Sequence, residues 1–230
     1  MPNTDVPIAN TKTQPAPDRP VPAAFLCRFR LTLPKVGTGP LAPPFDLPEA
    51  AELPHFAGLD GVGRFATVRV GWTPAGLAVA VEAGGKEKRP HAAVKKLAAG
   101  DGLHLWIDTR PSGTAHRAGR FCRRFALLPS VGQRKQPGAY EVPLSKAGGE
   151  ADPSKLDLPL KAKVTATGYT LAAFLPAELL PGFDPESTTT LALHTVVADG
   201  EKGDQPLTVD AAFPTAHDPS LWTRAELGNG

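Results

Sequence analysis

The residues with the greatest chemical potential are basic and lie together in one stretch. Residues 110–125 read RPSGTAHRAGRFCRRF, which is loop-like as far as Gly119 and strand-like beyond it. Guanidinium groups form forked, charge-assisted hydrogen bonds to carboxylate, sulfate or phosphate. The stretch therefore predicts an anion pocket built from Arg110, His116, Arg117, Arg120 and Arg124. The alternative, of equal weight, is a hairpin whose arginines pair with Asp101 and Asp108.

A second group of candidate residues precedes this stretch in an alternating run. His104, Trp106 and Asp108 alternate with Leu103, Leu105 and Ile107, and successive side chains of a strand point to opposite faces. The first three residues would form a stacking platform with polar neighbours if their face were exposed. The alternative is a face covered by a loop or a second sheet, because tryptophan is highly buried on average. With the pocket residues, these make eight candidate ligand-binding residues.

Charge is unevenly distributed along the chain. Twelve of the 25 basic residues and three of the 23 acidic residues lie between Gly84 and Lys135, so this segment carries +9 and the remainder −7. Such a basic region suits an anionic partner. The more common alternative is a set of solvated basic loops that pair with acids from the rest of the chain.

Other kinds of chemistry have little support. The six histidines show no i,i+2 or i,i+4 pairing, and no CxxC motif exists, so we expect no zinc site. Weak candidates for structural Ca²⁺ lie in a Gly-rich turn at Asp199, Glu201 and Asp204, but a plain turn is the simpler interpretation because no EF-hand ligand loop is present. No nucleophile elbow, phosphate loop or dinucleotide motif occurs. We therefore expect no enzyme and no cofactor; a hydrolase using Asp101 or Asp108 is the least supported alternative.

The elements that must position these residues are strands. Apolar residues alternate with period two over 25–33, 77–81, 103–107, 121–127, 158–164, 169–175 and 191–197, and Gly-containing turns separate the runs. Only short helical turns are expected, at Pro90–Ala99 and Pro176–Leu180. This pattern predicts an all-β, two-sheet antiparallel sandwich of the jelly-roll or immunoglobulin-like kind. We expect a disordered Pro-rich tail over residues 1–22 and a single sandwich domain over residues 23–230.

Two further predictions concern the thiols and the compartment. Cys27 and Cys122 both lie in apolar-alternating segments, so we interpret them as buried free thiols, with a disulfide as the alternative. The N-terminal sequence has no apolar region of the secretory kind, and no run approaches about 18 apolar residues. The default prediction is therefore a cytoplasmic protein without a membrane or nucleic-acid partner.

Several passages in a fixed order resemble the family 9 carbohydrate-binding modules, also described as DOMON-like sandwiches. They are FATVRVGWTPAGLAVAVEA (65–83), GDGLHLWIDTR (100–110), GYTLAAFLPAELL (168–180), LALHTVVADG (191–200) and DPSLWTRAEL (218–227). The resemblance implies a two-sheet sandwich without catalytic machinery. It also implies that the two tryptophans which clamp sugar in that family would stand at positions occupied here by Ala98 and Ala216.

These observations together favour a non-catalytic module that binds a ligand. The expected ligand is a glycan, acidic in character, or another anionic ligand, at a site displaced to the basic 110–124 region. The alternative is a protein-interaction or scaffold domain with a protein partner and no small ligand.

Overall fold

The computed structural model describes residues 21–94, 97, 100–144 and 152–229. The predicted disordered tail, residues 1–22, lies outside the described residues except for Val21 and Pro22. The predicted helical turn at Pro90–Ala99 lies partly outside them. No helix within the described ranges is both long and apolar enough to cross a membrane.

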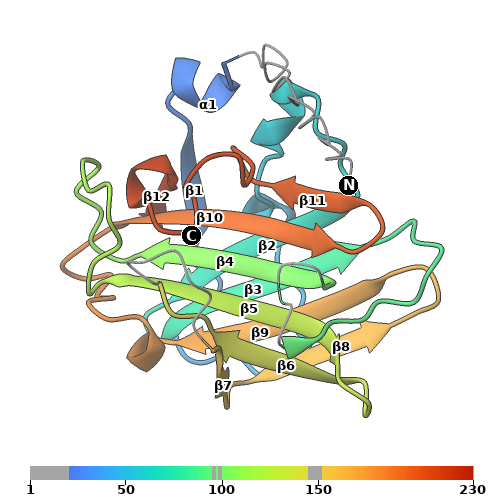
Figure 1. Ribbon diagram of the computed structural model, residues 1–230. Helices are drawn as coiled ribbons and strands as arrows, with labels where there is room; N and C mark the ends of the chain where they lie inside the picture. Colours follow the sequence, from blue (N-terminus) through green and yellow to red (C-terminus); the bar gives the residue numbers. More distant parts are fainter. Residues whose placement is uncertain (1–20, 95–96, 98–99, 145–151, 230) are drawn as a thin grey trace, which may run out of the picture.

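In the described residues, twelve strands form two sheets packed face to face, as the alternating pattern predicted (Figure 1). The larger sheet has the order β1 (Arg30–Pro34), β12 (Thr223–Gly228), β10 (Thr190–Asp199), β4 (Gly102–Asp108), β5 (Cys122–Val131), β6 (Gln136–Glu141) and β7 (Ser154–Leu156), with β11 (Gly203–Pro206) also paired to β10. The smaller sheet has the order β2 (Ala66–Thr73), β3 (Gly76–Ala83), β9 (Tyr169–Pro176) and β8 (Leu160–Val164). Neighbouring strands are antiparallel except β1 and β12, which run parallel.

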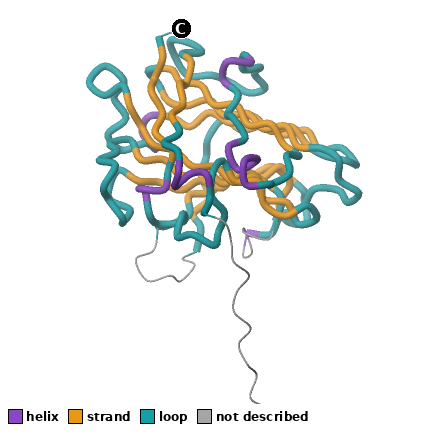
Figure 2. The backbone as a smooth tube through the Cα atoms, turned by 90° about the horizontal axis from the view of Figure 1, so that it is seen from above, coloured by secondary structure: helices purple, strands orange, loops and turns teal. Residues whose placement is uncertain are grey.

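The helical elements that lie wholly within the described residues are all short. They are α1 (Ala23–Leu26), η1 (Glu49–Ala51), η2 (Phe56–Asp60), η4 (Ala177–Leu179) and η5 (Pro219–Leu221). The helical turn predicted at Pro176–Leu180 is confirmed by η4. Figure 2 shows these turns and the loops around the layers of strands.

The core lies between the sheets and is made by alternate residues of each strand. Leu103, Leu105 and Ile107 of β4 point inward and are at most 1% exposed. They pack in one cluster with side chains of the opposite sheet such as Val70 and Val79. Period-two alternation therefore places the other residues of β4 on the outer face of the larger sheet.

The N-terminal run differs from the prediction of one strand over 25–33. Residues Ala23–Leu26 form a helical turn, and the strand begins only at Arg30. The reason is tertiary packing: Phe25 meets Phe213 with ring centroids 5.0 Å apart, and Phe29 stacks on Phe56 at 4.0 Å. Phe25 therefore packs on a loop residue and Phe29 on η2, and neither side chain belongs to the core between the sheets.

The two cysteines are free thiols. Cys122 is buried, as predicted, and burial raises the pKa of its thiol to about 11. Cys27 is exposed, so the prediction of burial was wrong for it. It follows α1 at the point where the chain has not yet joined the sheet.

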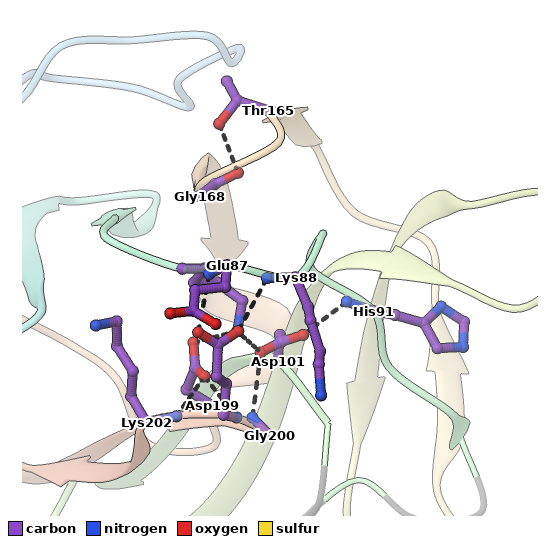
Figure 3. Close-up of polar contacts among 11 residues, drawn as sticks. Glu87, Lys88, His91, Asp101, Thr165, Gly168, Asp199, Gly200 and Lys202 are labelled. Atoms are coloured by element: carbon purple, nitrogen blue, oxygen red, sulfur yellow. Dashed lines mark hydrogen bonds and ion pairs between the residues drawn. The ribbon is translucent and has the colours of Figure 1, made fainter.

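A buried ammonium group joins the neighbouring ends of β4 and β10. Lys86 is 4% exposed, and its Nζ lies 2.7 Å from Asp101 Oδ1 and 2.6 Å from Asp199 Oδ2. The two carboxylates also accept backbone hydrogen bonds, Asp101 from His91 and Asp199 from residues 201 and 202 (Figure 3). This cluster therefore ties the 84–91 loop to the start of β4 and the end of β10.

The hydrogen bonds in this cluster shift the pKa values of its members. Burial opposes the charged form of Lys86, but its hydrogen bonds to Asp101 and Asp199 outweigh burial and raise its pKa above 10.5. Burial likewise opposes ionisation of Asp199, but the hydrogen bonds from Lys86 and the backbone lower its pKa below 3.8. The ion pairs consequently stabilise the fold across the whole pH range from 3.8 to 10.5.

Replacing Lys86 by Met tests this constraint. The change leaves two buried carboxylates without a cation and should lower the free energy of unfolding by about 3–5 kcal/mol at pH 7. The loss should shrink in acid, as the pH falls toward the lowered pKa of Asp199 and the carboxylate is protonated. Urea denaturation at several pH values measures both effects. Lys88→Met, an exposed change in the same loop, is the control, and equal stability of the two variants would contradict the account.

Candidate functional site

The predicted platform of His104, Trp106 and Asp108 lies on the outer face of the larger sheet, as alternation required. Strand β4 is central there: Trp106 faces His194 of β10 on one side and Arg124 of β5 on the other. The three platform residues are only 2%, 5% and 5% exposed. The face is thus covered and does not form an open groove.

The cover over Trp106 comes from the segment before β12. The Trp106 indole Nε1 donates to the carbonyl of Ala216 at 3.2 Å, and the Trp222 Nε1 donates to the carbonyl of Thr215 at 2.8 Å. Trp106, Trp222 and the buried Cys122 share one apolar cluster. Ala216, one of the two clamp positions, therefore bonds through its backbone to the tryptophan beneath it; Ala98, the other, lies outside the described residues.

Two histidines flank the indole of Trp106 within the covered face. The ring centroid of His104 lies 6.0 Å from that of Trp106, and the centroid of His194 lies 5.5 Å away. His194 is fully buried, and neither of its ring nitrogens has a hydrogen-bond partner among the described residues. Burial lowers the pKa of each histidine to about 3, assisted at His104 by the charge of Arg124. Both rings are therefore neutral at pH 7.

Of the five basic candidates, Arg110 and Arg124 are held by contacts within the protein, and the other three are exposed. Arg110 is a structural clamp: its guanidinium donates to the carbonyl of Gly182 and to the hydroxyls of Ser187 and Thr188. Arg124 lies over the ring of Trp106, with Cζ 4.7 Å from the centroid. The exposed members are His116, Arg117 and Arg120, and they belong to the loop between β4 and β5.

The carboxylates proposed as alternative partners for these arginines are occupied elsewhere. Asp101 binds Lys86, and Asp108 accepts the backbone N–H of Arg110 at 3.0 Å. The neighbouring Arg123 pairs instead with Glu141 at 3.1 Å. In the described part of the chain, neither Arg117 nor Arg120 has a carboxylate within ion-pair distance. We call His116, Arg117, Arg120 and Arg124 the arginine surface.

His116 takes part in a polar group that contains the residue types of a hydrolase triad. Its Nδ1 lies 3.1 Å from Ser220 Oγ and 3.3 Å from Asp218 Oδ2, while Ser220 Oγ donates directly to Asp218 at 2.6 Å. A triad needs the nucleophile and the acid on opposite ring nitrogens. Here both meet the same nitrogen, and Asp218 also accepts the Ser220 N–H that caps η5. The group therefore stabilises a turn and does not activate a nucleophile.

Two of the three calcium candidates, Asp199 and Glu201, already have other partners. Asp199 binds Lys86, and Glu201 accepts the backbone N–H groups of residues 87 and 88. Burial, with the nearby Asp210 charge, raises the pKa of Asp204. Within the described ranges, no group of three or more His, Cys, Asp or Glu side chains is placed to hold a metal ion.

Sequence reasoning missed two residues that organise this region. Lys86 carries no local signal, because its partners lie 15 and 113 positions away. His194 does carry one: it belongs to the alternation of 191–197 and shares the outward face with Ala192 and Val196. A histidine at this position of the alternating run could have indicated that a polar residue lies beside Trp106 on the outer face.

Replacing His194 by Leu should change how stability depends on pH. The unfolded chain binds a proton on this ring near pH 6.5, whereas the folded protein binds it only near pH 3. Unfolding of the wild type is therefore favoured as the pH falls through this window, and the variant should lose about 1.4 kcal/mol per pH unit of that dependence. Urea denaturation between pH 4 and 7 measures it, with exposed His217→Leu as the control. Parallel pH profiles for wild type and His194→Leu would contradict a neutral, buried ring.

Comparison with known proteins was informative at the level of structure. No protein-family model matches the chain, and no curated protein matches it. A family 9 carbohydrate-binding module from Caldicellulosiruptor kristjanssonii in complex with cellotriose is similar, with 14% identity, a TM-score of 0.57, and coverage of 88% of this chain and 95% of that one. A structure of such a module from the same organism with glucose gives 13% identity, a TM-score of 0.56, and coverage of 89% and 97%. The chain therefore has the fold of the family 9 carbohydrate-binding modules, as the sequence resemblance predicted.

Proposed function

We propose that this protein binds an acidic glycan without changing it chemically, and that the arginine surface makes the contact. The observation that carries the proposal is the pair of exposed guanidinium groups at Arg117 and Arg120. Neither has a carboxylate partner in the part of the chain that the structure describes, whereas Arg123 has one. Charge-assisted hydrogen bonds from arginine to carboxylate or sulfate are among the strongest polar contacts available at such a surface.

The covered platform supports this surface from beneath. Trp106 holds the guanidinium of Arg124 by a cation–π contact, and such contacts favour one orientation of the cation. Asp108 and Arg110 fix the corner where β4 enters the loop, through the bonds described above. Of the eight candidate residues, His116, Arg117, Arg120 and Arg124 would touch the ligand, and the other four would position them.

The choice of a glycan rests on the fold together with the chemistry of the surface. The similar modules hold cellotriose and glucose, and fold alone does not carry function. The polar group of His116, Asp218 and Ser220 adds hydroxyl-binding atoms beside the arginines. A ligand with both hydroxyl and acidic groups satisfies both kinds of partner, which a neutral sugar does not.

Replacing Arg117 and Arg120 together by Gln tests the proposal. Each charge-assisted hydrogen bond is worth about 1.5–3 kcal/mol, so the double variant should bind acidic oligosaccharides at least about 10-fold more weakly. Wild-type binding should also weaken with added salt, because exposed charges are screened. Isothermal titration calorimetry against sulfated and carboxylated oligosaccharides at two salt concentrations measures both effects.

A matched control removes the same charge from another loop of the same sheet. Arg134→Gln with Lys135→Gln alters exposed residues between β5 and β6 and should keep wild-type affinity. Equal affinities for both double variants would remove the arginine surface from consideration. Failure of the wild type to retain any glycan at low salt would favour the protein-interaction alternative.

A further inference from the structure

A groove of about 400 Å³ lies on the outer face of the smaller sheet, away from the arginine surface. It is lined by residues of all four strands of that sheet and by Pro44, Phe45 and Asp46. Its volume falls in the range of clefts that hold small ligands, about 300–1,000 Å³. The groove and Arg124 therefore lie on opposite faces of the sandwich.

The floor of the groove is formed by two rows of outward-facing residues. Strand register places Arg69, Ala80, Ala172 and Lys161 side by side in one row, and Thr67, Glu82, Thr170 and Lys163 in the next. The two central positions of the first row carry alanine, whereas those of the second row carry Glu82 and Thr170. Three steps of about 4.8 Å separate the outer strands β2 and β8. In the first row, Arg69 and Lys161 therefore start roughly 14 Å apart, with the two alanines between them.

A cover over the adjacent part of the sheet forms one wall. Leu47 and Ala51 pack on Ala78 and Phe174, which are paired in the next row of the sheet, and Phe45 packs at the margin of this cluster. The cover ends where the groove begins, so Phe45, which is half-buried, borders it. An aromatic side chain at this position offers an apolar surface to a ligand ring.

The charged residues of the groove include unpaired groups of both signs. Lys161 and Lys163 are exposed on the same side of β8. On the chain as far as the structure describes it, neither forms an ion pair, and the same holds for Glu82 and Asp46. Arg69 has a partner, Glu52, at 3.5 Å. Among the residues that the structure describes, the groove thus presents two ammonium groups and two carboxylates without ion-pair partners, beside a pair of alanines in its floor.

We infer that this groove is a second binding site, for an acidic sugar of one or two rings. The hydroxyls of such a ligand donate to the carboxylates of Glu82 and Asp46, and its own carboxylate accepts from Lys161 and Lys163. A ring lies on the alanine floor against Phe45. A purely anionic ligand would leave the carboxylates opposed by like charge, and a neutral sugar would leave the lysines unused. The inference stands on this groove alone and does not depend on the arginine surface.

Calorimetry with a disaccharide of galacturonic acid tests the site, with uncharged cellobiose for comparison. The protein used carries Arg117→Gln and Arg120→Gln, so that any contribution of the arginine surface is removed. It should still bind the acidic disaccharide and prefer it over cellobiose. Adding Lys161→Gln and Lys163→Gln should lower the affinity at least 10-fold, and Ala172→Phe, which fills the floor, should abolish binding.

Controls separate loss of the site from loss of the fold. Thermal unfolding checks that each variant is folded, and Lys155→Gln on β7 removes one exposed charge of the larger sheet and should leave the affinity unchanged. Absence of binding in the Arg117→Gln, Arg120→Gln protein overturns the groove site. The groove site is also overturned if cellobiose binds as tightly as the acidic disaccharide. The same holds if neither Lys161→Gln with Lys163→Gln nor Ala172→Phe changes the affinity. If instead the groove changes alone abolish binding in the wild-type chain, the arginine surface fails and the groove stands.

Discussion

The buried ammonium of Lys86 is the constraint on which the arrangement of the larger sheet depends. It binds Asp101 at the start of β4 and Asp199 at the end of β10, the two strands that carry Trp106, His104 and His194. A charge this deeply buried is tolerated only when its partners are in place. The alignment of the two strands at that end, and thus the row of rings on the outer face, is consequently tied to one cation.

The covered face changes how this fold presents a ligand surface. An open tryptophan would offer a stacking platform, but here Trp106 donates to the backbone of Ala216 and lies beneath the 213–222 segment. Its ring also contacts the guanidinium of Arg124. Under the proposed function, recognition would move from a slot between aromatic rings to the cationic and hydroxyl-binding groups of the arginine surface, which would favour acidic ligands over neutral ones.

The sequence predicted what depends on local periodicity and not what depends on distant partners. Alternation in β4 correctly placed Leu105 in the core and Trp106 on the opposite face, because a strand has a strict period of two. The same pattern held from Arg30 onward but failed over residues 25–29, since Phe25 packs on Phe213 and the chain turns before it joins the sheet. Whether the face of Trp106 was open could not be read from β4 itself, because the covering residues come more than 100 positions later. The groove on the smaller sheet was missed for a similar reason: its lysines and its phenylalanine belong to separate segments that only the sheet register brings together.

The central claim is that the arginine surface, made by the exposed arginines of the β4–β5 loop with Arg124, binds an acidic glycan. Mapping of backbone amide chemical shifts by NMR, during titration with a disaccharide of galacturonic acid, tests it most directly because every amide reports its own position. The account predicts concentration-dependent shifts at residues 116–124 that weaken with added salt, with a separate set of shifts at β8 and β9 for the groove. Shifts absent from residues 116–124, while the ligand binds elsewhere, would contradict it.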